Sequence, residues 1–193
     1  MGGRLPNPVD RRVQRTQAAL RDALVTLIAE RGWDGFSVQD VCDRANVGRS
    51  TFYTHFADKE ELIGGAFEEL KRFLRSQVGS VGDGPPRPLA FSRGLVDHAW
   101  EQRRLFVAVV GKRSGHLVQR KFRDAVLALV REDLDAALPA GPKRGAAAAF
   151  LGGALLELLT WWLEAKSPLP PETVDGLFHE LAAPVLAVAG YRR

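Results

Sequence analysis

Residues 37–56 have the sequence SVQDVCDRANVGRSTFYTHF. Val38, Val41, Cys42 and Ala45 recur at three- and four-residue spacing, which predicts a short helix over 37–45. Asn46 follows where the chain must turn, and asparagine tolerates a positive φ better than most residues other than glycine. A second short helix is expected over 49–55. The stretch therefore predicts a helix-turn-helix whose second helix has the length of a recognition helix for the major groove of DNA.

The second helix contains side chains suited to two kinds of DNA contact. Phe52 and Phe56 are expected to face the core, and Gly48 can serve as a permissive N-cap. Arginine can donate two hydrogen bonds to guanine, whereas hydroxyl and imidazole groups can donate to phosphate oxygens. We expect Arg49, Ser50, Thr54 and Gln39 to lie near the bases. The full DNA-facing set is Gln39, Gly48, Arg49, Ser50, Thr51, Tyr53, Thr54, His55 and Lys59.

Composition indicates an ordinary globular protein with an anionic partner. The chain has 193 residues, 46% of them hydrophobic, and a formal net charge of +4. It has one cysteine, Cys42, which is expected to be a buried small hydrophobe rather than part of a disulfide. The four histidines lack metal-ligand spacing, so we expect no metal and no cofactor. The N-terminus has no apolar segment and no run has the length of a membrane span, so a cytoplasmic protein without a membrane partner is expected.

Helical periodicity continues through the rest of the chain. Helices are expected at about 11–31, 59–77, 89–101, 102–111, 115–138, 143–166 and 171–189. Ser37 with Asp40 and Asp58 with Glu61 resemble capping boxes, and the Gly- and Pro-rich residues 79–88 predict a loop. No strand-like alternation is present. The predicted fold is all-α with about nine helices: a three-helix DNA-binding domain over 1–57, with a flexible arm over 1–10, and a helical domain over 58–193.

The order of these segments resembles the TetR family of regulators. The matching pieces are GWDGFSV, after the leading helix, and DVCDRANVGRSTFYTHFADKEEL. The close match covers roughly residues 13–66, and the remainder is similar only as a helical segment of suitable length. Asn46 stands where the family usually has glycine, Gly48 where serine commonly caps the recognition helix, and Cys42 where alanine is usual. The resemblance implies that Thr51, Tyr53, His55 and Lys59 contact phosphates.

The resemblance also implies a homodimer and a small-molecule effector. Its last two helices would form the dimer interface, and the apolar character of both segments is compatible with this. Expected interface residues are Ala149, Gly152, Gly153, Leu156, Phe178, Leu181 and Val185. An effector cavity is expected among the middle helices, lined by His98, Trp100, Phe106, His116, Phe122 and Glu157. The scarcity of cationic residues in the apolar stretches favours a neutral, hydrophobic effector.

The sequence therefore predicts a ligand-responsive regulator, most simply a repressor, that binds a palindromic operator as a dimer. An alternative is a protein-interaction module that keeps the fold without recognising DNA. An enzyme is not expected, because we find no Gly-rich phosphate loop, no nucleophile elbow and no plausible Ser/His/Asp arrangement. Asp97 and His98 are adjacent, but neighbouring helical positions point in different directions. The effector, the operator and the target genes are not encoded in any recognisable motif.

Overall fold

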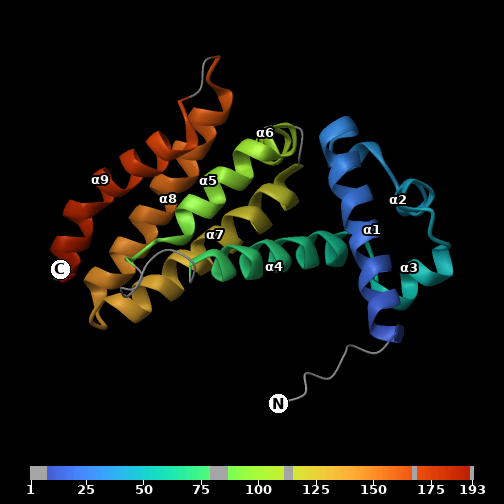
Figure 1. Ribbon diagram of the computed structural model, residues 1–193, viewed down its shortest axis with the longest axis horizontal. Coiled ribbons are helices and arrows are strands. Elements are labelled where there is room, and N and C mark those ends of the chain that lie inside the picture. The colour runs from blue at the N-terminus through green and yellow to red at the C-terminus, as the bar shows by residue number, and fades with distance from the viewer. Residues whose placement is uncertain (1–7, 79–86, 111–114, 167–168, 192–193) are drawn as a thin grey trace.

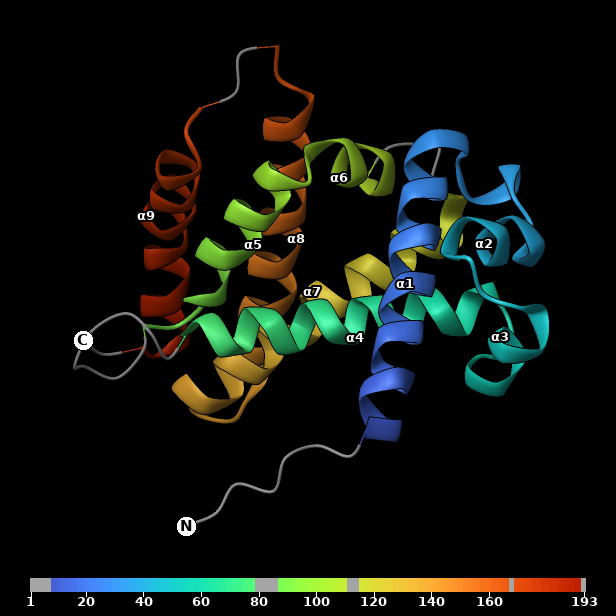
Figure 2. The same cartoon turned by 45° about the vertical axis from the view of Figure 1, so that its right-hand side comes forward.

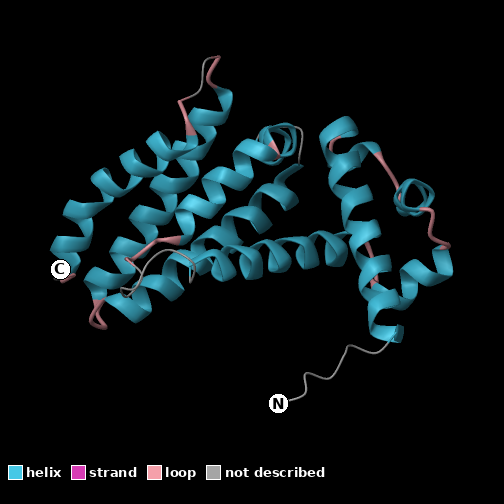
Figure 3. Cartoon of the chain, viewed as in Figure 1, coloured by secondary structure: helices cyan, strands magenta, loops and turns pink. Residues whose placement is uncertain are grey.

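The computed structural model describes residues 8–78, 87–110, 115–166 and 169–191, and these ranges contain nine α-helices and no β-strand (Figures 1 and 3). A short 3-10 turn, η1, spans Trp33–Gly35. The helices are α1 (Pro8–Arg31), α2 (Val38–Ala45), α3 (Arg49–His55), α4 (Lys59–Val78), α5 (Phe91–Glu101), α6 (Arg103–Val110), α7 (Gly115–Ala137), α8 (Pro142–Glu164) and α9 (Pro171–Ala189).

The first three helices form one end of the molecule. α1 packs on α2 and on α4, and its fully buried residues Leu20, Leu24, Leu27 and Ile28 follow the spacing of one helix face. α2 and α3 lie beyond α1, at the right of Figure 1. Because only one side of each of these short helices is covered, their other sides remain open to solvent.

α4 joins this end to the rest of the protein. It runs from α3 beneath α1 and packs farther along on α5 and α7 (Figure 1). α7, α8 and α9 pack on one another in sequence order, and α5 packs on α9. α6 lies between α5 and α1 in Figure 2, and it contacts α1, α7 and α8. α8 and α9 therefore lie at the end of the molecule opposite α2 and α3.

The expected helices are all present, with small differences at their ends. α1 begins at Pro8, so part of the arm expected over residues 1–10 is helical; residues 1–7 lie outside the described ranges. The same holds for residues 79–86 of the expected loop and for residues 111–114. The all-α prediction is confirmed, and α4 begins two residues after the expected domain boundary at residue 57.

One helix differs from expectation in its hydropathy. α8 is long and apolar enough to cross a membrane by length and composition alone, with a mean hydropathy of 1.5 over its most apolar window. Half of that window is buried inside the protein. Core helices of soluble proteins have the same properties, so this feature is at most a weak indication of a membrane span.

Candidate nucleic-acid interface

α2 is capped at both ends, which fixes where α3 begins. The Ser37 hydroxyl accepts from the Asp40 backbone N–H, and the Asp40 carboxylate accepts from the Ser37 N–H at 2.8 Å, forming the expected capping box. Hydrogen bonds from Ser37, together with Arg31 at 3.0 Å, lower the pKa of Asp40 to about 2. At the other end Asn46 has φ 52° and ψ 46°, the left-handed conformation expected from the sequence.

α3 presents a polar face to solvent. Phe52 and Phe56 are buried, as the sequence predicts, and hold the helix against the core. Gly48, the N-cap, has φ −66° and makes no side-chain cap because it has no side chain. Its exposed neighbours on α3 are Arg49, Ser50, Thr51, Tyr53 and Thr54, whereas His55 is half-buried. Six of the nine expected DNA-facing residues therefore lie on one short surface helix, and Gly48 lies at its start.

Several of these side chains are held by neighbours on their own helix. The Arg49 guanidinium donates to the Tyr53 hydroxyl at 3.3 Å and lies 5.7 Å from the ring centroid. Thr54 Oγ1 donates to the Ser50 carbonyl at 2.9 Å. On α2, Gln39 Nε2 donates to Asp43 Oδ1 at 2.6 Å. These local contacts orient the side chains in the absence of DNA.

The positive charge of this surface is concentrated at Arg49. The other arginine of α2 and α3, Arg44, is paired with Glu30 of α1 through two hydrogen bonds of 2.7 and 2.8 Å. Arg31, at the end of α1, is paired with Asp40. Arg49 thus remains the guanidinium of these two helices without a carboxylate partner, which suits it to an anionic or strongly accepting ligand.

Lys59 has a role that the sequence did not reveal. Its ammonium group donates to the carbonyls of Trp33 at 3.0 Å and Phe36 at 2.6 Å, and it lies 4.8 and 4.3 Å from the centroids of their rings. Burial lowers the pKa of Lys59. The residue therefore fastens the turn before α2 to the start of α4. A phosphate contact stays a prediction and would use the one remaining N–H. The partners lie 23 and 26 residues upstream, beyond the reach of a local pattern.

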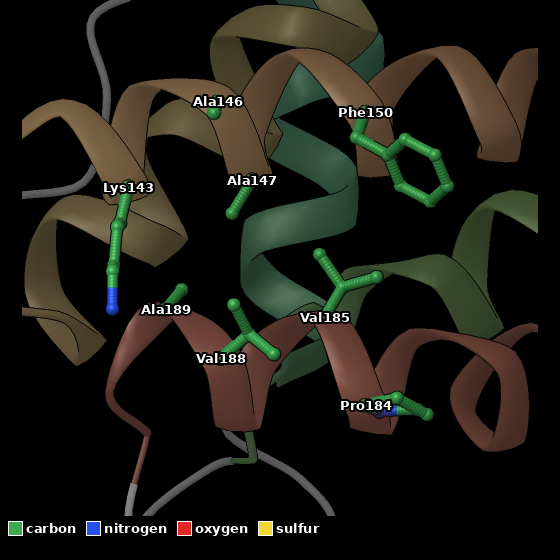
Figure 4. Close-up of a pocket in the computed structure, with 8 residues that line it drawn as sticks. All are labelled: Lys143, Ala146, Ala147, Phe150, Pro184, Val185, Val188 and Ala189. Carbon is green, nitrogen blue, oxygen red and sulfur yellow. The ribbon is translucent and has the colours of Figure 1, made fainter.

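A second exposed surface is apolar and lies on the outer side of α8 and α9. Phe150 is 63% exposed, Leu181 69% and Val188 70%. A groove of about 410 Å³ runs between the two helices, with Lys143 at one end and Phe150 toward the other (Figure 4). A neighbouring groove of about 330 Å³ includes Phe150, Trp161 and Leu181. Large exposed apolar surfaces of this kind mark interaction sites.

The residues expected at the dimer interface do not all lie on this surface. Ala149 and Leu181 are exposed, and Gly153 and Val185 are partly so, as an interface requires. Gly152, Leu156 and Phe178 instead lie in the core of the protomer. A Cβ at Gly152 would collide with Leu127 of α7, so this glycine serves packing within the chain. The exposure of Phe150 was not predicted, because every side of α8 carries apolar residues and the sequence does not distinguish core from surface.

Three of the six residues expected in an effector cavity form an aromatic cluster. Phe106 and Phe122 are buried with ring centroids 5.6 Å apart, and His98 lies 5.6 Å from Phe106. Burial lowers the pKa of His98, although Glu101 acts in the opposite direction. This cluster joins α5, α6 and α7.

The other three expected cavity residues lie elsewhere. Trp100 is 41% exposed and stacks on Trp162 at 5.6 Å, while His116 is exposed near the start of α7. Glu157 lines the outer groove between α8 and α9. The six residues thus do not surround a common space. The sequence did not predict this, because helical periodicity identifies the face on which a residue lies but not the helix that packs against that face.

The structure brings together a serine, a histidine and an aspartate that the sequence analysis did not combine. Ser92 Oγ lies 2.5 Å from Asp175 Oδ1 and 3.0 Å from His179 Nε2. Asp175 and Ser92 both approach Nε2, whereas a catalytic triad places its acid on the opposite ring nitrogen. Ser92 is fully buried, so a substrate has no access to its hydroxyl. The cluster joins α5 to α9 and lacks the geometry of a nucleophilic site.

The same cluster is electrostatically stabilised. Burial alone would raise the pKa of Asp175, but hydrogen bonds from His179 and Ser92 and the charge of Arg87 lower it overall. Among the residues that the structure describes, no group of three or more His, Cys, Asp or Glu side chains is arranged to hold a metal ion. The exposed polar face of α3 therefore remains the strongest candidate for a functional site.

Comparison with known proteins matches this face to a family of regulators. The family model for bacterial regulatory proteins of the tetR family matches residues 20–66, which include α2 and α3. An uncharacterized HTH-type transcriptional regulator, YxbF of Bacillus subtilis, is 43% identical over 56 residues, 28% of this chain and 15% of its own length. The HTH-type transcriptional repressor KstR2 of Mycobacterium tuberculosis is 27% identical over 89 residues, 46% of this chain and 44% of its own length.

Similarity of fold extends over nearly the whole chain. The crystal structure of a TetR transcriptional regulator from Streptococcus agalactiae has a TM-score of 0.66 and 24% sequence identity, covering 90% of this chain and 96% of that one. The chain spans less than half of the length of the two curated relatives that it matches. Residues 20–66 thus match the tetR family of bacterial regulatory proteins, and the chain as a whole shares the fold of a solved TetR regulator.

Proposed function

We propose that this protein is a ligand-responsive transcriptional repressor that binds a palindromic operator as a homodimer. The observation that carries the proposal is the exposed polar face of α3, headed by Arg49, at one end of the molecule. Its length and residue types suit direct contact with base edges, and its hydroxyl groups suit contact with phosphates. The name of the relative KstR2 supports repression rather than activation.

The apolar surface of α8 and α9 supports the dimer. Joining two copies across Phe150, Leu181 and Val188 would cover side chains that are otherwise exposed. A twofold axis at this end would place two α3 helices at the opposite ends of the assembly. Two identical recognition helices related by such an axis require an inverted repeat in the DNA.

The effector would act by coupling to DNA binding. Ligand response is typical of the family, and a small molecule held among the helices of residues 58–193 would favour one spacing of the two DNA-binding ends. Operator affinity then changes by the same factor as effector affinity. The protein would act in the cytoplasm on double-stranded DNA, and the proposal includes no catalytic step.

Selection of bound duplexes from a random pool at near-physiological salt tests the proposal. Enrichment of an inverted repeat would support sequence-specific binding by a symmetric dimer, and the half-site spacing would give the distance between the two α3 helices. Failure to enrich any sequence with folded, dimeric protein would contradict it. That result would favour the competing function, an interaction module that has the fold without DNA recognition.

A further inference from the structure

A groove lies where the DNA-binding end meets the helical domain. It has a volume of about 450 Å³ and lies between α1 on one side and α4, the end of α5 and the start of α6 on the other. α1 contributes residues from Ala18 to Val25, and α4 contributes residues from Ala66 to Phe73, each at three- or four-residue spacing. The position of α6 between α5 and α1 is visible in Figure 2.

The charges of the groove do not cancel. Arg21 of α1 and Glu69 of α4 form an ion pair of 2.5 Å, so the guanidinium is already engaged. Asp22, next along α1, is exposed and has no ionic or hydrogen-bonding partner for its carboxylate in the described ranges. One negative charge is therefore left without compensation at the edge of the groove.

The inner side of the groove is aromatic and carries one neutral acceptor. The ring of His98 lies 5.5 Å from Phe73, which is 43% exposed. Because burial lowers its pKa, His98 is the neutral imidazole near pH 7, with one nitrogen able to accept a hydrogen bond. Neither ring nitrogen of His98 has a hydrogen-bond partner among the residues that the structure describes. Leu70 and Leu105 add apolar surface beside these rings.

We propose that this junction groove binds a small organic cation that combines an apolar ring with an ammonium group. The ammonium group would lie near Asp22, with Glu69 adding negative potential and His98 an acceptor. The ring would cover Phe73 and the neighbouring leucines, where aromatic and cation–π contacts are available. An anion of the same shape would meet Asp22 unfavourably, since Arg21 is already paired.

The groove also connects occupancy to the DNA-binding end. α1 packs directly on α2, and the opposite side of the groove belongs to α4, α5 and α6. A bound cation would therefore favour one position of α1 relative to α6. This consequence rests on the proposed function, since a change in operator affinity presupposes an operator. Binding of the cation itself does not depend on it.

Isothermal titration calorimetry with three probes of similar shape tests the charge preference on the full chain. The probes are 2-phenylethylamine, 2-phenylethanol and 3-phenylpropionate, which are cationic, neutral and anionic near pH 7. We expect the amine to bind about tenfold more tightly than either other probe, as a partly exposed ion pair and a cation–π contact allow. Equal binding of the three probes, or no detectable binding of the amine, would overturn the proposal.

Two variants locate the site. Asp22→Asn should remove the preference for the amine, whereas Asp124→Asn, the same change on the exposed side of α7, should leave it intact. Ala18→Phe should fill one side of the groove and abolish binding of the amine. Circular dichroism and the unfolding midpoint check that both Asn variants fold. A preference unchanged by Asp22→Asn would assign the cation to another site and reject the groove.

Operator titrations with and without the amine separate this inference from the proposed function. DNA selection that succeeds while the amine fails to bind rejects the groove alone. Amine binding that depends on Asp22, with no sequence enriched from the DNA pool, supports the groove and rejects the proposed regulator. Operator affinity that the amine leaves unchanged would reject the coupling between the groove and α1.

Discussion

α3 and α8 each leave one face uncovered, but the two faces differ completely in chemistry. α3 buries Phe52 and exposes arginine and hydroxyl groups, whereas α8 buries nine residues and still exposes Phe150 and Trp161. A face rich in donors retains its hydration in solution and can exchange it for phosphates and bases. Covering an apolar face with another apolar surface is favourable, because it removes both surfaces from water. The proposed function uses both faces, with DNA at the polar end and a second copy of the chain at the apolar end.

A charge introduced at the apolar end is expected to have the largest effect. Leu181→Glu should raise the dimer dissociation constant by roughly 100-fold or more, because an unpaired buried charge costs about 3–5 kcal/mol. Sedimentation equilibrium measures the shift from dimer to monomer. Val107→Glu adds the same charge to an exposed position of α6 and should leave the dimer intact. A dimer unaffected by Leu181→Glu would show that α8 and α9 are not the interface.

Substitutions at the polar end separate the proposed base contacts from the proposed phosphate contacts. Arg49→Ala should cost about 1–3 kcal/mol at one base pair of each half-site and relax the preference there. Tyr53→Phe should weaken binding to all sequences alike and reduce its dependence on salt. Fluorescence anisotropy with the selected operator and single-base variants distinguishes the two patterns. Uniform loss for Arg49→Ala would identify it as a phosphate contact.

Two adjacent glycines test which face of α8 belongs to the core. Gly152→Leu should destabilise the protomer by about 1–3 kcal/mol, because its side chain must displace Leu127. Gly153→Leu meets no atom within 4 Å of its Cβ and should leave the protomer as stable or slightly more so. Urea unfolding in the Leu181→Glu background measures both changes without a contribution from the dimer. Equal destabilisation by both substitutions would contradict this division of the helix.

The capping box before α2 is expected to contribute about 1 kcal/mol to the free energy of unfolding, which is the usual cost of replacing an N-cap serine by alanine. Ser37→Ala should therefore lower the free energy of unfolding at pH 7. Because the native pKa of Asp40, about 2, lies below its ordinary value of 3.8, the box stabilises the fold fully above about pH 4. This contribution is lost as the pH falls through about 2. Urea titrations at pH 7 and pH 3 measure the free energy of unfolding of both proteins. The difference between Ser37→Ala and the wild type should be smaller at pH 3.

The smallest expected effect concerns the uncapped start of α3. Gly48 has φ −66° and ψ 147°, which serine adopts without strain, and a Cβ there makes only ordinary contacts. Gly48→Ser should stabilise the protein by a few tenths of a kcal/mol, the usual difference between these N-caps. Thermal unfolding detects the shift. A lowered midpoint would show that the glycine has another structural role.

The two ends of the molecule also differ in how much of their structure can be predicted from the sequence. Helix positions, the turn at Asn46 and the buried pair Phe52 and Phe56 were predicted because each depends on residues a few positions apart. The residues expected at the interface and in the cavity do not form two compact sets: Gly152 lies in the core and Trp100 stacks on Trp162. Those assignments depend on which helix packs against which face, and periodicity carries no such information.

The sequence by itself thus determined the helices, their caps and the exposed polar face of α3, because hydrogen bonding along a helix and the spacing of apolar residues are local properties. Tertiary structure alone decided which apolar residues of α8 remain exposed and how Lys59 fastens the turn at Trp33. It also brought Ser92 to Asp175 and His179, and Asp22 to the same groove as His98. These arrangements join residues separated by 23 to 87 positions, and only the packing of whole helices sets the distances between them.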